Sequence, residues 1–299
     1  MANPIEKSVP DSQMKTPSTL GIVANEIYRD KLALISLIFL VVFLAVIYSS
    51  TFVITRDTAT RVDLTALQTP PSAAHWLGTD TSGRDVFGQL ILGARNSFTI
   101  GFLITVISAV IGIVMGLTAG FYGGWIDNLM MRFVDFVYIL PMLMLIIVFV
   151  TIVPNYNIMT FVLVMSGFLW IGKARLIRAK TLGERQKDYV SASLLTGAPG
   201  WEVMLFQILP NLSSIIIVNL TLTLAGNIGI ETGLSYLGFG LPADTPSLGT
   251  LVNNANDPEI IQHYWWMWLP ACLTILMLML SINFVGQALK RAANANQRL

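Results

Sequence analysis

The sequence predicts an all-α membrane protein with six transmembrane helices. Of its 299 residues, 54% are hydrophobic and only 12% are charged, whereas soluble domains average about 25% charged residues. Six segments are also long and apolar enough to cross a bilayer, which requires about 20 mostly apolar residues. These segments are residues 32–54, 98–121, 129–153, 158–176, 212–233 and 266–289.

Glycine and proline predict specific geometry in three of these spans. Gly112, Gly116 and Gly120 recur every four residues, so they share one face of the second span and allow another helix to approach closely. Pro141 in the third span and Pro270 in the sixth lack a backbone N–H. We therefore expect both prolines to kink or loosen their helices.

Basic residues are distributed unevenly between the two sides of the predicted bundle. An even number of spans places both tails on one side, together with the segment 173–210, and that side carries 14 of the 18 Lys and Arg residues. Because basic residues accumulate on the cytoplasmic side, we expect a multi-pass protein of the cell membrane with both termini in the cytoplasm. The net charge of +1 does not indicate an acidic partner. We expect contact with membrane lipid but not with nucleic acid.

The segment 173–210 is polar and basic although apolar spans flank it. We interpret its basic residues as solvated signals of topology; they are Lys173, Arg175, Arg178, Lys180, Arg185 and Lys187. The pattern predicts two short helices at a tight bend, in which Asp188 caps the first helix, Gly197 ends it and Pro199 lies in the first turn of the second. An apolar stripe at helical spacing follows: Trp201, Met204, Leu205 and Ile208.

Small side chains lie at the centre of this segment. Ser191, Ala192 and Ser193 fall on the first short helix, where they permit close docking into a groove on a partner. The alternative is an amphipathic loop that rests on the membrane, held against anionic lipid by its lysines and arginines.

Polar residues follow one face of the fifth span. Asn219, Thr223, Asn227 and Glu231 are each four residues apart, so they share a broad helix face. Such a face avoids hydrocarbon and should line either an aqueous path or an interhelical hydrogen-bonded contact, and the sequence leaves both open. Glu231 lies near the outer end and could instead help to close an external gate.

The third span contains a pair of opposite charges. Arg132 and Asp135 are three residues apart and are expected to pair.

The external segment 55–96 is predicted to contain a short amphipathic helix. Its apolar face consists of Val86, Phe87, Leu90 and Ile91. Either Thr81 or Ser82 would cap this helix. A second external segment, 234–264, contains the run from Leu234 to Gly240 followed by two prolines.

The sequence contains no constellation that indicates catalysis. It has no phosphate-binding Gly-x-x-x-x-Gly-Lys-Ser/Thr motif, no Gly-x-Ser-x-Gly, no His-Glu-x-x-His and no pair of cysteines. We therefore predict no catalytic residues, no metal site and no enzymatic activity in this chain. His75 and His263 are distant from each other in the sequence, and no residue near either of them makes a metal-ligand spacing.

Two motifs resemble a known family. A small-residue triplet, a glycine four residues later and a Leu-Pro ending resemble the coupling loop of importer-type ABC transporter permeases, with Ser191 where that family prefers Glu. Residues 77–97 resemble the signature of the C-type subunits of dipeptide and oligopeptide importers. The matching positions include Gly78, Asp80, Gly83, Arg84, Asp85 and Arg95.

The resemblance implies the fold, function and partners of an ABC importer permease for peptides. It implies a pseudo-symmetric second permease subunit, two cytoplasmic ATPase subunits that bind ATP and Mg, and an extracytoplasmic peptide-binding protein. This chain would itself bind no cofactor. It also implies that Ser191, Ala192, Ser193, Gly197, Trp201, Leu209 and Pro210 form the ATPase-coupling loop.

The predicted organisation has four parts. Residues 1–30 form a cytoplasmic tail, 31–96 the first span with its external loop, 97–291 the permease core, and 292–299 a second cytoplasmic tail. Two alternatives remain: the same architecture with nickel or another small solute as cargo, and a self-contained channel or carrier without an ATPase.

Overall fold

The described residues of the protein form a helical bundle. The computed structural model describes residues 19–153, 156–242 and 245–296, and within these ranges the regular structure is helical apart from one isolated bridge between Thr79 and Asp85. The all-α prediction is therefore confirmed. Of the predicted tail 1–30, residues 1–18 lie outside the described residues. The rest of the tail contains α1 (Thr19–Arg29).

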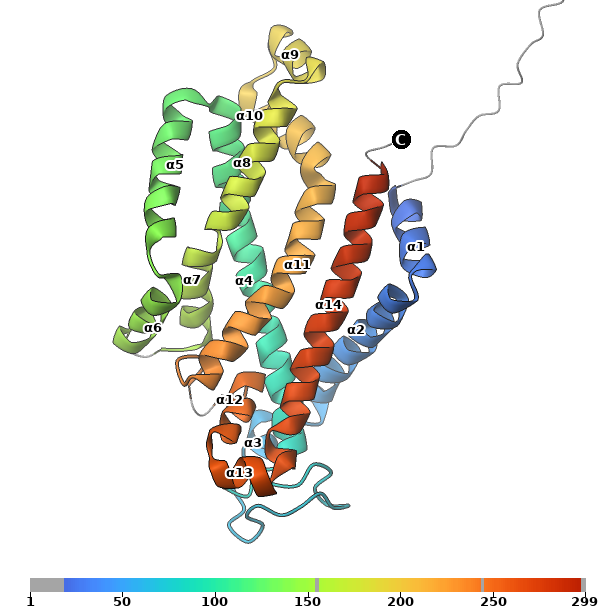
Figure 1. Ribbon diagram of the computed structural model, residues 1–299, viewed down its shortest axis with the longest axis vertical. Coiled ribbons are helices and arrows are strands. Elements are labelled where there is room, and N and C mark those ends of the chain that lie inside the picture. Colours follow the sequence, from blue (N-terminus) through green and yellow to red (C-terminus); the bar gives the residue numbers. More distant parts are fainter. Residues whose placement is uncertain (1–18, 154–155, 243–244, 297–299) are drawn as a thin grey trace, which may run out of the picture.

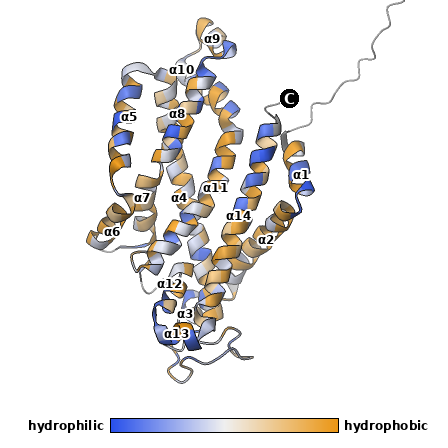
Figure 2. Cartoon of the chain, viewed as in Figure 1, coloured by the Kyte–Doolittle hydropathy of each residue, from blue (hydrophilic) through white to orange (hydrophobic). Residues whose placement is uncertain are grey.

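Four helices are long and apolar enough to cross a membrane. They are α2 (Lys31–Ser49), α4 (Val86–Tyr122), α11 (Leu209–Tyr236) and α14 (Leu269–Asn296). Two bent helix pairs qualify when each is taken together: α5 (Gly124–Ile139) with α6 (Met142–Ile152), and α7 (Ile158–Leu169) with α8 (Ile171–Arg185). The described bundle thus has four spans, or six if each bent pair counts as one. Apolar residues dominate its middle (Figure 2).

The two proline predictions have opposite outcomes. Pro141 lies at the break between α5 and α6, which are bent by 79°, so the predicted kink is confirmed. Pro270 does not kink a helix, because α14 begins at Leu269 and the proline lies in its first turn. The first turn tolerates proline since its N–H groups have no intrahelical partner.

The predicted separate amphipathic helix before the second span is wrong. Val86 begins α4, which continues without a break for 37 residues. At 1.5 Å per residue it is about 55 Å long, well beyond a hydrocarbon core of about 30 Å. Its cap is also not Thr81 or Ser82, because the Asp85 carboxylate accepts the hydrogen bond from the Gly88 amide at 2.7 Å.

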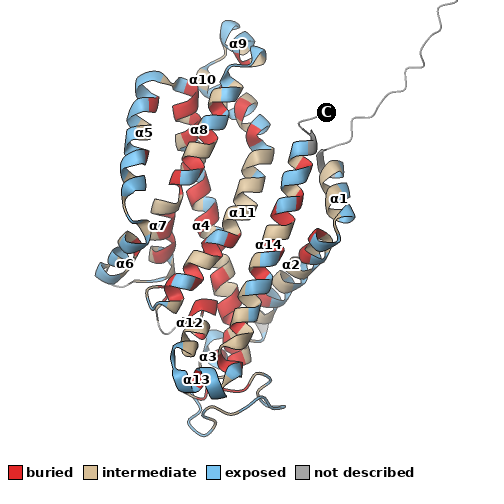
Figure 3. Ribbon diagram, viewed as in Figure 1, coloured by how far each residue is buried: buried red, intermediate tan, exposed pale blue. Residues whose placement is uncertain are grey.

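The glycine face of α4 packs directly against α8, as the four-residue spacing predicts. A Cβ atom at Gly112 would lie 2.7 Å from the Lys173 Cβ, one at Gly116 2.6 Å from the Ala174 carbonyl oxygen, and one at Gly120 2.7 Å from the Thr181 Cβ. Only glycine allows these two backbones to come this close. Buried residues concentrate along this contact (Figure 3).

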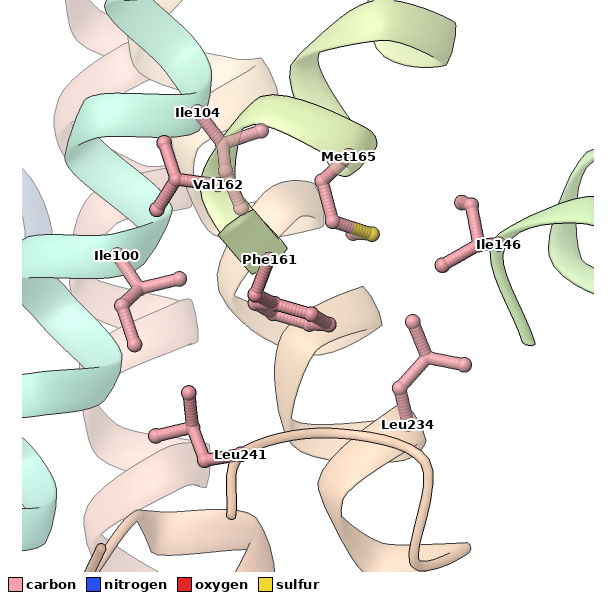
Figure 4. Close-up of a cluster of buried hydrophobic side chains, with 8 residues drawn as sticks. All are labelled: Ile100, Ile104, Ile146, Phe161, Val162, Met165, Leu234 and Leu241. Carbon is pink, nitrogen blue, oxygen red and sulfur yellow. The ribbon is translucent and has the colours of Figure 1, made fainter. Parts of the chain in front are cut away.

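A second core cluster fixes the bent pairs to the long helices. Figure 4 shows Ile146 of α6 and Phe161 of α7 turned towards Ile104 of α4 and Leu234 of α11, and all four are buried. Because the chain bends at Pro141, α6 does not continue α5 as one straight helix. The buried cluster therefore stabilises α6 and α7 against the long helices.

The two ends of the bundle carry different structures (Figure 1). At one end, called here the α9 end, lie α9 (Asp188–Leu195) and α10 (Gly200–Val203), and α1 and the last turns of α14 reach the same end. The opposite end, the α13 end, carries α3 (Arg56–Ala59), α12 (Leu248–Asn253), α13 (Pro258–His263) and the loop that leads into α4.

Candidate functional site

A protruding loop at the α9 end is the main candidate functional site. Residues 173–185, which the sequence analysis included in the polar segment, belong to helix α8. The loop itself follows, and contains α9, α10 and a π-helical turn, η2 (Met204–Ile208). Val190, Val203 and Ile208 are fully buried against α4 and α8. These three side chains anchor the loop on the bundle.

The bend between the two short helices is built around Gly197. Its φ angle is +89°, and its amide donates to the Leu194 carbonyl while the Ala198 amide donates to that of Ser193. This left-handed stop confirms the predicted end of the first helix. Asp188 is not the cap, because Lys187 occupies the cap position and Asp188 lies inside the first turn.

Two further sequence predictions for this loop need correction. Pro199 is the cap residue of α10, one position before the predicted first turn. The apolar stripe also divides, since Ile208 is buried whereas Trp201 and Leu205 are exposed. The reason is the π-helical turn, whose i→i+5 bond from the Leu209 amide to the Met204 carbonyl rotates the following residues away from the α-helical register.

The tip of the loop presents small and apolar side chains to solvent. Ser191, Ala192 and Gly197 are all exposed. Beside them, Leu195 is 88% exposed and Leu194 41% exposed. These two leucines were not predicted to be functional residues, although their position directly before Thr196 and Gly197 was a usable signal. These exposed leucines lie at the end of the bundle, away from its apolar middle. Exposed apolar side chains in such a position form a surface suited to contact with a partner protein.

The other predicted loop residues have different surroundings. The Ser193 hydroxyl donates to the Gln207 side-chain oxygen at 2.9 Å and thereby links α9 to η2. Trp201 and Leu209 line an apolar cleft of about 320 Å³ against α4, and Pro210 lies in the first turn of α11. Ser193 thus has a partner inside the loop, whereas Ser191, Ala192 and Gly197 are exposed to solvent.

A hydrogen-bonded network joins α9 to both neighbouring spans. The Tyr189 hydroxyl donates to the Glu184 carboxylate of α8 at 2.9 Å and accepts from the Asn211 amide of α11 at 2.9 Å. Glu184 also pairs with Lys187 at 2.7 Å. Burial raises the pKa of Tyr189 above its ordinary value, so the hydroxyl keeps its proton and its role as donor. The Tyr189 hydroxyl thus connects α9 to α8 and to α11.

The polar face of α11 divides along its length. Asn227 is buried and its amide donates to the Thr105 hydroxyl of α4 at 2.8 Å. Glu231 is fully buried and accepts from the Ser235 hydroxyl at 2.8 Å. Asn219 and Thr223, closer to the α9 end, are only half-buried. The half of this face nearer the α13 end is therefore buried and hydrogen-bonded within the chain. The half nearer the α9 end is more accessible to solvent.

The contact between Asn227 and Thr105 gives a first testable prediction. We expect the single variants Asn227→Leu and Thr105→Val, combined in a double-mutant cycle, to show a coupling free energy of about 0.6 kcal/mol, the average for such bonds in membranes. Unfolding of the detergent-solubilised protein measures it. Additive effects of the two variants would contradict an interhelical role for Asn227.

The motif at residues 77–97 builds the turn that leads into α4. Gly78 and Gly83 have φ angles of +68° and +75°. The Asp80 carboxylate accepts hydrogen bonds from the backbone amides of Ser82 and Arg84 and from the Gln89 side chain. The buried Nε atom of Arg84 has no hydrogen-bond partner among the described residues.

The remaining motif residues contact the start of α4 and the end of the first span. Asp85 caps α4 and its carboxylate pairs with His75 at 3.0 Å. The Arg95 side chain donates to the Thr51 hydroxyl at 2.8 Å. The motif therefore shapes this end of the molecule.

Several basic residues of the segment 173–210 have partners that the sequence analysis did not anticipate. Asp135 pairs with Arg175 of α8, at 2.5 Å, and not with Arg132. Arg178 makes two bonds to the Asp127 carboxylate, at 2.5 and 2.6 Å. Lys173 is only 6% exposed and donates to the Ser108 hydroxyl at 2.9 Å. These contacts tie α8 to α4 and α5, so the view of all six basic residues as solvated signals is wrong.

The described residues provide no cluster of three or more His, Cys, Asp or Glu side chains that could hold a metal ion. The two histidines are engaged elsewhere, His75 with Asp85 and His263 with the Glu259 carbonyl.

Comparison with known proteins agrees with this geometry. Residues 108–295 match the family described as "Binding-protein-dependent transport system inner membrane component". The oligopeptide transport system permease protein OppC of Lactococcus lactis subsp. cremoris is 46% identical over 281 residues, covering 94% of this chain and 96% of its own. The dipeptide transport system permease protein DppC of Bacillus subtilis is 35% identical, covering 90% of this chain and 83% of its own.

A bundle of spans with an anchored, outward-facing loop at one end defines a multi-pass membrane subunit of a larger assembly. The chain belongs to the family of inner-membrane components of binding-protein-dependent transport systems. It is a permease component, a transport subunit and not a catalytic one, and such a system implies a binding protein and ABC partners.

Proposed function

We propose that this chain forms, with a second and pseudo-symmetric permease subunit, the path through which an ABC importer carries di- and oligopeptides. The observation that carries the proposal is the 46% identity to an oligopeptide permease along nearly the whole of both chains. A peptide has amide groups and charged termini, and the open half of the α11 face, with Asn219 and Thr223, offers matching polar side chains. Glu231 would help to close the path at the external side.

The loop that carries α9 would couple the path to two ATPase subunits in the cytoplasm. The uneven distribution of basic residues supports a cytoplasmic position for this loop and for both termini. Closure of the ATPases on ATP would displace α9, and the Tyr189 network would pass that displacement to α8 and α11. A peptide receptor on the external side would deliver the cargo. ATP and Mg would bind to the partner subunits.

Docking through the loop tip gives a second prediction. Leu195→Asp is expected to weaken co-purification of the ATPase subunits at least tenfold, because burial of a leucine contributes about 1.5–3 kcal/mol and a carboxylate would have to be desolvated. Leu195 is 88% exposed, so the fold should not change. Leu64→Asp at the α13 end, where the side chain is 74% exposed, is the matched control. Equal co-purification of both variants would argue against docking through α9.

The cargo is tested in a strain that lacks this chain. Growth on peptides as the only source of an essential amino acid should fail and return when the chain is supplied again, while nickel uptake stays unchanged. Loss of nickel uptake with normal growth on peptides would indicate the alternative cargo. Transport by the purified chain alone, without ATPases, would indicate a self-contained carrier.

A further inference from the structure

A cleft with a basic rim opens at the α9 end between α8, α11 and α14. Its volume is about 310 Å³. Lys180 of α8 and Lys290 of α14 line it together with two carboxamides, Asn219 and Asn294. The remaining wall is apolar and includes Val218 and Leu222 of α11. The cleft therefore combines positive charge, hydrogen-bond donors and an apolar surface.

The two lysines of this cleft lack the partners that their basic neighbours have. Arg178 of α8 pairs with Asp127. Arg291, the residue after Lys290, pairs with Glu26 and Asp30 near α1. Lys180 and Lys290 are both exposed, and neither has a carboxylate within ion-pair distance in the described part of the chain. Their positive charges are thus available to an anion.

The position of the cleft along the bundle matches the boundary of a membrane. Lys290 follows Leu269, the first residue of α14, by 21 positions, which corresponds to about 30 Å of helix and so to the thickness of a hydrocarbon core. An ammonium group at this depth lies at the level of lipid headgroups. The apolar side chains of Val218 and Leu222 belong to α11, itself one of the apolar spans.

We propose that this cleft binds an anionic membrane lipid, with its phosphate between Lys180 and Lys290 and an acyl chain along Val218 and Leu222. Basic pockets between transmembrane helices bind anionic headgroups in this way. The apolar wall favours a lipid over free phosphate, because a free ion would leave that wall uncovered. The lipid would bridge α8 and α14. Asn219 belongs both to this cleft and to the path proposed above, so the experiment must separate a bound lipid from cargo at this position.

Native mass spectrometry of the full chain, purified with its permease partner, tests the proposal. Phosphatidylglycerol is titrated against phosphatidylcholine with wild type, with the double variant Lys180→Gln and Lys290→Gln, and with Arg132→Gln as a control that removes an exposed charge outside the cleft. We expect wild type to prefer phosphatidylglycerol. In the double variant the affinity for phosphatidylglycerol should fall about tenfold or more, as two headgroup contacts predict, and the control should match wild type.

Three results would overturn the proposal. The first is an unchanged preference in the double variant, with an unfolding midpoint equal to that of wild type, since the fold would then be intact and the lysines irrelevant. The second is displacement of phosphatidylglycerol by inorganic phosphate at equal concentration, which would indicate an anion site without lipid specificity. The third is displacement by a short peptide with a free carboxyl terminus but not by its amide, which would assign the cleft to the cargo path.

Discussion

Replacing Gly116 with alanine is expected to destabilise the protein by about 2 kcal/mol, the usual range for overpacking of a closed contact. The new Cβ would lie 2.6 Å from the Ala174 carbonyl oxygen, 2.8 Å from the Ile177 Cβ and 2.9 Å from the Arg178 amide nitrogen. Two of these are backbone atoms of α8, so no side-chain rotation relieves the clash. The gain of about 1 kcal/mol in helix propensity offsets only part of it.

Gly172→Ala, on the opposing helix, is the matched control. A Cβ at Gly172 would meet nothing within 4 Å, so the same substitution should leave stability unchanged or raise it by up to about 1 kcal/mol. Thermal unfolding in detergent should show a midpoint about 5 °C lower for Gly116→Ala. Equal midpoints for the two variants would mean that α4 and α8 separate at little cost, and that the glycines are not needed for the contact.

Much of this fold could be predicted because its signals are local. Hydropathy located the apolar segments, since each span carries its own signal within about 20 residues. The four-residue spacing of the glycines predicted a close helix contact, and the structure supplies the partner, α8. The break at Pro141 followed from the missing N–H group. Nothing local, however, required the fourth span to be bent by 42° between α7 and α8.

The errors arose where a residue has partners distant in sequence. Asp135 has Arg132 within reach along its own helix, yet it binds Arg175, which is 40 residues away. Lys173 reads as a solvated charge, but its Ser108 partner is 65 residues away. The start of α4 was misplaced because Thr81, Ser82 and Asp85 are all acceptable caps, and tertiary contacts decide among them.

The local structure of the loop that carries α9 was predicted in outline. The turn at Gly197 and the small residues beside it were predicted because both features follow from residue types that lie within ten positions of each other in the sequence. The π-helical turn before Pro210 was not, and it changed which apolar residues of the stripe are buried. Hydrophobic periodicity assumes an α-helical register, so it fails wherever that register changes.

Replacing Gly83 with alanine is expected to detach the loop at the α13 end from the start of α4. Gly83 has φ of +75°, where a Cβ costs about 1–2 kcal/mol. Its Cβ would also clash with the Asp63 carbonyl group, whose carbon would be 2.7 Å away. Together these effects should cost about 3 kcal/mol. The turn that the Asp80 carboxylate closes on the amides of Ser82 and Arg84 should then open.

Hydrogen exchange separates the two causes. The amides of Ser82, Arg84 and Gly88 should exchange on the order of 100-fold faster in Gly83→Ala, since about 3 kcal/mol corresponds to roughly that factor. Gly238→Ala is the matched control, because Gly238 has φ of +83° but a Cβ there would meet nothing within 4 Å. That variant should accelerate exchange around residue 238 only by about tenfold. If both variants had equal local effects, the contact with Asp63 would add nothing to backbone strain, and the glycine would be needed for its φ angle alone.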